Sequence, residues 1–342
     1  MTLKTPVTLA GAPPSPYTRK MLSVLRYRHI PYRVIWKNPR EMNDLPQPKV
    51  GLLPTFYLDN DADELEAVVD STPLIARFDL EVADRQVRPA DPVIRLIDDL
   101  LEDYGDEWLT KAMFHYRWYY EADIKQAGED LPRARIKAPT EEQAKELATI
   151  FRDRQISRLY VVGSNDITAP VIEESYARII EALRAHLVEH PFIMGNRPGA
   201  ADFAFFGQLT QLAQFDPTPM AVTLEAAPRV YAWVLLMEDL SGEEPADDGW
   251  FTTNTIPATL RAILSEVGRV YTPFLLANAK ALEAGADEVD TTIGGVRWVQ
   301  KPFPYQGKCL MVLRERYNAL STEDRTAFDA IITGTGCEAI FA

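Results

Sequence analysis

The sequence Ser15-Pro16-Tyr17-Thr18-Arg19-Lys20 follows the apolar run Val7-Thr8-Leu9-Ala10-Gly11 across a turn that contains two prolines. The apolar run predicts a buried strand, and the prolines end it. Ser15 stands at the expected N-cap of a helix, and Pro16 occupies the first helical position, where its missing N–H is not needed. The junction therefore places a serine hydroxyl beside the open amides of a helix N-terminus, which stabilise a bound anion.

Residues 1–85 continue this alternation, and the order β-α-β, followed by a β-β hairpin and a helix, describes a thioredoxin-like domain. The third strand follows Gly51-Leu52-Leu53-Pro54, and the last helix begins near Asp70-Ser71-Thr72-Pro73. The expected elements are a strand over 7–11, a helix over 15–28, strands over 32–37, 55–58 and 66–69, and a helix over 74–80.

A change in composition over 86–92 predicts a linker. Helical periodicity dominates beyond it, so we expect an all-helical domain over 91–245 and an additional, mostly helical region over 246–342. The pair Gly294-Gly295 predicts a hairpin within this last region. The predicted helices lie near 91–104, 106–126, 140–162, 169–189, 200–214, 227–239, 257–284, 306–320 and 322–333.

The composition restricts the class of protein. With 342 residues, of which 46% are hydrophobic, the chain can form two or three globular domains. A net charge of −14 without a basic block argues against nucleic acids and anionic membranes as partners. No apolar run reaches the ~18 residues of a membrane span, and residues 1–6 do not resemble a signal peptide. Only two cysteines occur, which favours the cytoplasm. The histidine spacing suggests no metal site.

Four motifs within residues 5–242 resemble those of the glutathione transferase family. Ser15-Pro16-Tyr17 is similar to the Ser-Pro-Phe sequence of the plant tau class, where the omega class has Cys-Pro-Phe. The resemblance implies an α/β thioredoxin-like N-terminal domain and an all-α C-terminal domain, followed here by an additional helical module. The other motifs are Leu53-Pro54 before a strand, Asp70-Ser71 at a helix start, and Gly195-Asn196-Arg197-Pro198-Gly199-Ala200-Ala201-Asp202-Phe203 before a long helix.

The resemblance also implies that particular residues bind glutathione as a co-substrate. Ser15 would donate a hydrogen bond to its thiolate, and Tyr17 is the second candidate donor. Pro54 would be cis, with the backbone of Leu53 paired to the cysteinyl part. The remaining implied contacts are Asp70 and Ser71 with the γ-glutamyl carboxylate, Lys37 and Lys49 with the glycyl carboxylate, and Tyr116 and Tyr119 with a small hydrophobic electrophile.

Several of these residues also have purely structural interpretations. Ser15 can be a plain N-cap, and Lys37 and Lys49 can be solvated surface side chains. The sequence departs from the family pattern at two positions. Gly199 stands where a Ser or Thr normally caps the long helix, so we expect one hydrogen bond to be lost there. Asp70 is one methylene shorter than the usual Glu or Gln.

We therefore predict a cytoplasmic, homodimeric glutathione transferase that activates the thiol of glutathione as a thiolate. Two alternatives stay open. One is a protein that keeps this fold for interaction without turnover, and the other is a glutathione-dependent lyase or isomerase. Residues 246–342 have no counterpart in the family. Their strip Pro302-Phe303-Pro304-Tyr305-Gln306 predicts either a docking contact with the helical domain or a lid over the pocket.

Overall fold

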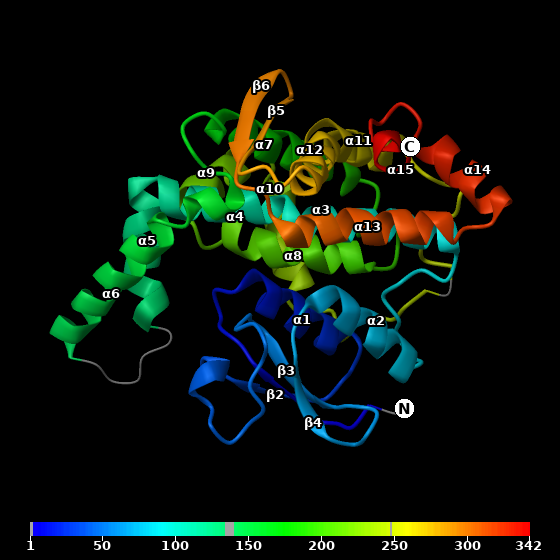
Figure 1. Cartoon of the computed structure of the whole chain (residues 1–342). Helices are drawn as coiled ribbons and strands as arrows, with labels where there is room; N and C mark the ends of the chain where they lie inside the picture. The colour runs from blue at the N-terminus through cyan, green and yellow to red at the C-terminus, as the bar shows by residue number, and fades with distance from the viewer. Residues whose placement is uncertain (1–2, 134–139, 247) are drawn as a thin grey trace.

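The N-terminal part of the chain is a four-stranded sheet with helices packed against it (Figure 1). The computed structural model describes residues 3–133, 140–246 and 248–342. The strand order is β2-β1-β3-β4, in which only β1 and β2 are parallel, so the thioredoxin-like fold is confirmed. The elements are β1 (Val7–Ala10), α1 (Pro16–Tyr27), β2 (Tyr32–Ile35), η1 (Pro39–Glu41), β3 (Thr55–Asp59), β4 (Leu65–Val68) and α2 (Ser71–Glu81).

The second part is all-helical, and its helix α8 is buried along its whole length between α1 and α3. The single helix expected over 106–126 is interrupted at Trp108 and Tyr120. Helical periodicity continues across both positions, so the sequence pattern does not reveal the breaks. The elements are α3 (Pro92–Glu107), α4 (Leu109–Tyr119), α5 (Glu121–Arg133), α6 (Glu141–Ile156), η2 (Leu159–Val162), α7 (Ala169–His186), α8 (Ala200–Leu212), α9 (Pro217–Ala226) and α10 (Pro228–Met237).

Helix α9 was not expected from the sequence, because Pro217 and Pro219 are typical of a turn. Both prolines instead stand in the first turn of the helix, where no N–H is required. Within the described ranges, no single helix is both long and apolar enough to cross a membrane. By length and composition the pair α9 and α10 would qualify together, but the two helices are bent by 114°.

The N-terminus of α8 is capped by a residue that is distant in the sequence. The N–H groups of Ala200 and Ala201 donate to the carboxylate of Asp98, on α3, at 3.1 and 2.9 Å. Asp202 accepts from the N–H of Gly199 at 2.9 Å. A Cβ at position 199 would collide with the Asp98 carboxylate. The side-chain hydrogen bond expected to be lost at Gly199 is indeed absent, but Asp98 compensates by accepting from two other amides of the same helix end.

The C-terminal module, which runs from α11 onward, shares one continuous hydrophobic core with the helical domain. Helix α11 packs against α7, and α13 runs along α3 (Figure 1). The expected hairpin turns at Gly294 and Gly295. The helix expected over 257–284 contains a π-helical segment at Gly268, where the backbone of 335–337 leaves no room for a side chain. The elements are α11 (Ala258–Glu266), η3 (Val267–Tyr271), α12 (Thr272–Glu283), β5 (Val289–Ile293), β6 (Val296–Gln300), α13 (Pro304–Asn318), α14 (Thr322–Ile332) and α15 (Glu338–Phe341).

Helix α3 carries carboxyl groups where it meets α1 and the C-terminal module. Burial raises the pKa of Asp106 to about 7 and that of Glu107 to about 8. In the unfolded chain a carboxyl group has a pKa of ~4. Between pH ~4 and the raised pKa values of Asp106 and Glu107, the folded chain therefore binds more protons than the unfolded chain. Stability therefore falls as the pH rises through this window. Two buried bases oppose this: burial lowers the pKa of Lys111 to about 7 and that of His186 to about 4.

We expect the Tm of the protein to rise when the pH is lowered from 8 to 6.5. Three carboxyl groups, Asp106, Glu107 and Asp202, have pKa values raised to about 7 or 8, whereas of the two bases only Lys111 titrates in this interval. For each proton that only the folded chain binds, the free energy of unfolding increases by about 1.4 kcal/mol per unit by which the pH is lowered. Thermal unfolding at constant ionic strength measures the effect. Glu107→Gln should reduce the rise, whereas Glu189→Gln, at an exposed position, should not. A Tm that falls over this interval would contradict the raised pKa values.

Candidate functional site

The candidate residues of the N-terminal domain leave the sheet at one edge. Ala10 at the end of β1 lies beside Ile35 at the end of β2 and beside Thr55 at the start of β3. Val68 at the end of β4 lies beside Phe56. The segments after β2, after β1, before β3 and after β4 therefore follow one another at strand spacings of ~4.8 Å. In this order they carry Lys37, Ser15, Leu53-Pro54 and Asp70-Ser71.

Ser15 lies near the middle of this edge and is the N-cap of α1, as its interpretation as a cap predicts. Its Oγ accepts a hydrogen bond from the N–H of Thr18 at 3.2 Å. Among the described residues, the Ser15 hydroxyl donates to no acceptor. This half-buried hydroxyl therefore keeps a hydrogen that it can donate to a ligand.

Tyr17 stands just inside α1, and its hydroxyl donates to the backbone carbonyl of Asp106 at 2.7 Å. Burial, together with the charges of Glu107 and Asp106, raises the pKa of Tyr17 well above its ordinary value. Its hydrogen is already used in a contact between α1 and α3. Of the two candidate donors, the geometry therefore favours Ser15.

The loop before β3 contains the proline that the sequence singles out. The Leu53–Pro54 peptide bond is cis, as expected, and Pro54 is buried. The hydroxyl of Thr55 donates to the carbonyl of Leu52 at 2.7 Å and so holds the loop in place. Lys37 and Lys49 are both exposed, and in the described ranges neither forms an ion pair, which is compatible with either of their interpretations.

Asp70 precedes α2 with φ +84°, a backbone conformation that few residues with a side chain adopt. Its carboxylate accepts no hydrogen bond from the first amides of α2, so it is not a side-chain cap. Instead, Oδ2 of Asp70 accepts a hydrogen bond from the hydroxyl of Tyr305 at 2.8 Å. Tyr305 belongs to α13, so the C-terminal module touches the candidate site.

The hydroxyl of Ser71 joins a buried charge cluster that no sequence motif predicts. Nζ of Lys20 lies 2.6 Å from Asp106, 2.7 Å from Glu102 and 3.1 Å from the Ser71 hydroxyl. Although burial lowers the pKa of Lys20, Asp106 and Glu102 raise it above its ordinary value. The cluster links α1, α2 and α3. The available signal for it was a lysine with Pro16 and Val24 one helical turn to either side, because a lysine on a buried helix face needs carboxylate partners.

A cavity of about 300 Å³ lies beside the start of α1, on the side of α5 and α8. Residues just before and just after Ser15 line this cavity, so it lies next to that serine. It combines an apolar wall with amide and charged groups, which suits a small and partly apolar molecule. Its lining residues are Pro13, Pro14, Arg19, Asp130, Leu131, Thr210, Gln211, Gln214 and Phe215.

Tyr116 and Tyr119, the residues predicted for an electrophile pocket, are not among the residues that line this cavity. Tyr116 is 4% exposed and stacks on Tyr120, with ring centroids 5.7 Å apart. The hydroxyl of Tyr119 donates to Asp166 at 2.8 Å. Periodicity places these rings on a helix, but it cannot show which face of α4 meets the N-terminal domain.

Arg117, from the same aromatic run, does reach the site. Its guanidinium binds Asp216 through two nitrogens at 2.8–3.1 Å and donates to Gln211 at 2.8 Å. Nη1 also lies 3.5 Å from the carbonyl oxygen of Pro14. Arg117 therefore braces the loop that leads into Ser15 against the end of α8.

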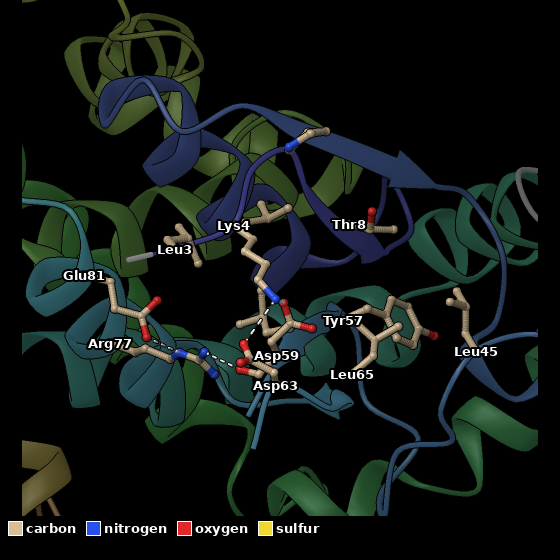
Figure 2. Close-up of a pocket in the computed structure, with 13 residues that line it drawn as sticks. Leu3, Lys4, Thr8, Leu45, Tyr57, Asp59, Asp63, Leu65, Arg77 and Glu81 are labelled. Carbon is tan, nitrogen blue, oxygen red and sulfur yellow. Dashed lines mark hydrogen bonds and ion pairs between the residues drawn. The ribbon is translucent and has the colours of Figure 1, made fainter. Parts of the chain in front are cut away.

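The largest of the described cavities, about 370 Å³, does not belong to this site (Figure 2). Thr8 and Tyr57 line it from the side of the sheet opposite to Leu9 and Phe56, which pack in the main core. Its charged groups neutralise one another: Figure 2 shows Lys4 between Asp59 and Asp63, and Arg77 directed at Glu81. None of the predicted site residues lines it.

Comparison with models of protein families identifies both halves of this arrangement. Residues 9–86 match the N-terminal domain of glutathione S-transferases, and residues 141–235 match the C-terminal domain. The chain belongs to the glutathione S-transferase family. The N-terminal match includes every candidate residue of the sheet edge. Neither match extends into the C-terminal module, so in this member of the family α11 to α15 are additional to both domains.

Solved structures of glutathione transferases resemble the chain at low sequence identity. One from Pseudomonas fluorescens Pf-5, with two glutathione molecules bound, is 16% identical over 75% of this chain and 92% of its own, with a TM-score of 0.42. A tau-class enzyme from mango, Mangifera indica, is 20% identical over 75% of this chain and 95% of its own, with a TM-score of 0.40. A Burkholderia graminis transferase, with two glutathione molecules bound per subunit, is 15% identical over 75% and 87%, with a TM-score of 0.41. A search of curated proteins finds no match.

Proposed function

We propose that this member of the family is a glutathione transferase that binds glutathione along the sheet edge and activates its thiol as a thiolate for attack on a small electrophile. The observation that carries the proposal is the Ser15 hydroxyl. It lies at the N-terminus of α1, and within the described part of the chain its hydrogen is donated to no protein acceptor. A donor of this kind is what a thiolate requires.

The sheet edge has a length and charge pattern that suit glutathione. From Lys37 after β2 to the start of α2 after β4 the edge covers three strand spacings, ~14 Å. An extended tripeptide spans ~10 Å, and the two extra methylenes of the γ-linkage and the long lysine side chain cover the remainder. With the thiol at Ser15, the glycyl carboxylate points towards Lys37, beyond the end of β2. The γ-glutamyl carboxylate meets the N-terminus of α2, where the amides of Ser71 and Thr72 favour an anion.

The Ser15 hydroxyl and the N-terminus of α1 together can supply the free energy that thiol activation needs. A free thiol has a pKa near ~8.5, so about 3% is thiolate at pH 7. Lowering this pKa by ~2 units requires ~2.7 kcal/mol. A hydrogen bond from Ser15 to the charged sulfur contributes ~1.5–3 kcal/mol, and the N-terminus of α1 adds ~0.3–1 kcal/mol.

The electrophile binds in the cavity beside α1, in our proposal, and not against Tyr116 and Tyr119. The thiolate forms a bond to an electrophilic carbon, and the electron pair of the broken bond stays on the departing group. Leu131 and Phe215 contact the apolar part of the substrate. The cytoplasmic location and the homodimer stay predictions.

Titration with glutathione in a calorimeter tests the proposal, in two buffers of different ionisation enthalpy at pH 7. We expect binding with the release of close to one proton, because the thiol ionises on the protein. Binding without proton release would contradict thiol activation. Absence of binding would contradict the whole proposal and favour a fold retained for interaction.

A further inference from the structure

A third cavity, of about 170 Å³, lies at the γ-glutamyl end of the proposed glutathione site. Asp70 and the first turn of α2, including Thr72, form one wall, and α3 forms the second. The third wall is α13, which runs along α3 above α2 (Figure 1). A ligand that extends from Ser15 towards α2 therefore ends against the C-terminal module.

The carboxylates around this cavity differ in their partners. Asp99 is paired with Arg316 at 2.8 Å, and Glu102 is paired with Lys20 at 2.7 Å. Asp70 and Asp103, by contrast, have no cation within ion-pair distance in the described ranges. Each accepts a hydrogen bond from a tyrosine of the C-terminal module: Asp70 from Tyr305 at 2.8 Å and Asp103 from Tyr271 at 2.7 Å. The module thus orients two carboxylates without neutralising them.

Tyr305 is held firmly at this position. The neighbouring Phe303 exchanges two hydrogen bonds with the side chain of the buried Asn278, through its N–H at 2.8 Å and its carbonyl at 3.1 Å. On the other side, the amide of Gln306 donates to Glu107 at 3.0 Å. The strip over 302–306 is therefore fixed to α12 of its own module and, through Gln306, to α3 of the helical domain, and in this position the Tyr305 hydroxyl points at Asp70.

We propose that Tyr305 of the C-terminal module is a positioning residue of the glutathione site, where it holds the Asp70 carboxylate ready to receive the α-ammonium group of the γ-glutamyl residue. The inference rests on the proposed function. A carboxylate at Asp70 repels the carboxylate of the same γ-glutamyl residue, which therefore meets the amides of α2. The ammonium group is the one part of the ligand whose charge complements Asp70 and Asp103.

The inference also gives a role to the C-terminal module, which lies outside both matched domains. By closing the γ-glutamyl end of the site, α13 makes recognition of the α-amino group depend on residues from outside both domains. Asp70 itself is a poor position for a test, because its φ of +84° means that most substitutions change the backbone as well. Tyr305 is the better position, since phenylalanine keeps the ring and removes only the donor.

The experiment compares the Kd of glutathione with that of glutaryl-cysteinylglycine, which lacks only the α-amino group. Both ligands are titrated into the full-length protein and into Tyr305→Phe. We expect the unmodified protein to prefer glutathione, and Tyr305→Phe to weaken glutathione by about three- to tenfold while changing the analogue less than twofold. The matched control is Tyr160→Phe, at an exposed tyrosine whose hydroxyl has no protein partner in the described residues. It should leave both Kd values unchanged.

Each other outcome has a separate meaning. If the protein binds neither ligand, the proposed function itself fails. If it binds both equally well, the function stands and the recognition of the α-amino group is overturned. Equal weakening of both ligands by Tyr305→Phe would show a merely structural tyrosine. Tighter glutathione binding in this variant would show that Tyr305 obstructs the site, which also overturns the proposal.

Discussion

Replacing Ser15 with alanine is expected to lower kcat/KM for glutathione at pH 7 by about 10- to 100-fold, which corresponds to loss of a hydrogen bond to a charged group. The thiolate then keeps only the amides of the α1 N-terminus as its donors. The same loss raises the pKa of the bound thiol, so the fall in activity should be largest near pH 7 and smaller at higher pH. Steady-state kinetics over pH 6–9 and the ultraviolet absorbance of the bound thiolate measure both effects.

Alanine at position 15 also removes a helix cap, which by itself costs about 1 kcal/mol of stability. The matched control is Ser321→Ala, because Ser321 caps α14 in the same way, accepting from the N–H of Asp324 at 3.1 Å. This control should lose a similar amount of stability and no activity. Ser15→Thr, which keeps a hydroxyl, should restore part of the activity. If Ser15→Ala retains activity within a few-fold, Ser15 has no part in the mechanism.

Replacing Lys20 with methionine is expected to destabilise the protein by about 3–5 kcal/mol at pH 8, because it leaves Glu102 and Asp106 buried without their cation. The loss should be smaller at pH 6. Burial already raises the pKa of Asp106 to about 7, and removal of Lys20 raises it further, so this carboxyl group becomes protonated as the pH falls. Denaturant unfolding at the two pH values measures the difference.

Lys111→Met is the matched control for this effect. Lys111 is as deeply buried as Lys20, but its Nζ contacts the amide oxygen of Gln300 at 2.9 Å and forms no ion pair with a carboxylate in the described residues. Replacing Lys111 leaves no carboxylate without its ion-pair partner, so we expect a much smaller loss of stability. Equal losses for the two variants, or a Lys20→Met loss under about 1 kcal/mol, would show that the Lys20 cluster does not stabilise the fold.

Local signals in the sequence account for much of the N-terminal domain. The N-cap at Ser15 and the proline at position 16 define the start of α1, and the alternation of apolar runs and turns gives the order of the elements along the chain. The cis bond before Pro54 follows from the resemblance to the family, not from local preference. The breaks at Trp108 and Tyr120 were not predictable, because helical periodicity is the same on both sides of each break.

The capping of α8 shows why the candidate site was only partly predictable. At Gly199 the sequence shows a missing side chain, but not that Asp98 supplies the hydrogen bonds from another helix. Likewise, Tyr116 and Tyr119 belong to an aromatic run that suggests a pocket, whereas Arg117 of the same run braces the loop before Ser15. The periodicity of a helix does not predict which of its faces contacts an element that is distant in the sequence.

The sequence by itself determined the elements whose causes are local: the strand–turn–helix junction at Ser15, the hairpin at Gly294-Gly295, and the family to which these motifs belong. The tertiary structure alone decided the contacts between residues far apart in the chain. It buried Lys20 against Glu102 and Asp106, and it brought Tyr305 to Asp70. The physical reason is that capping and turn preferences act over a few residues, whereas ion pairs and cavity walls depend on how whole helices pack.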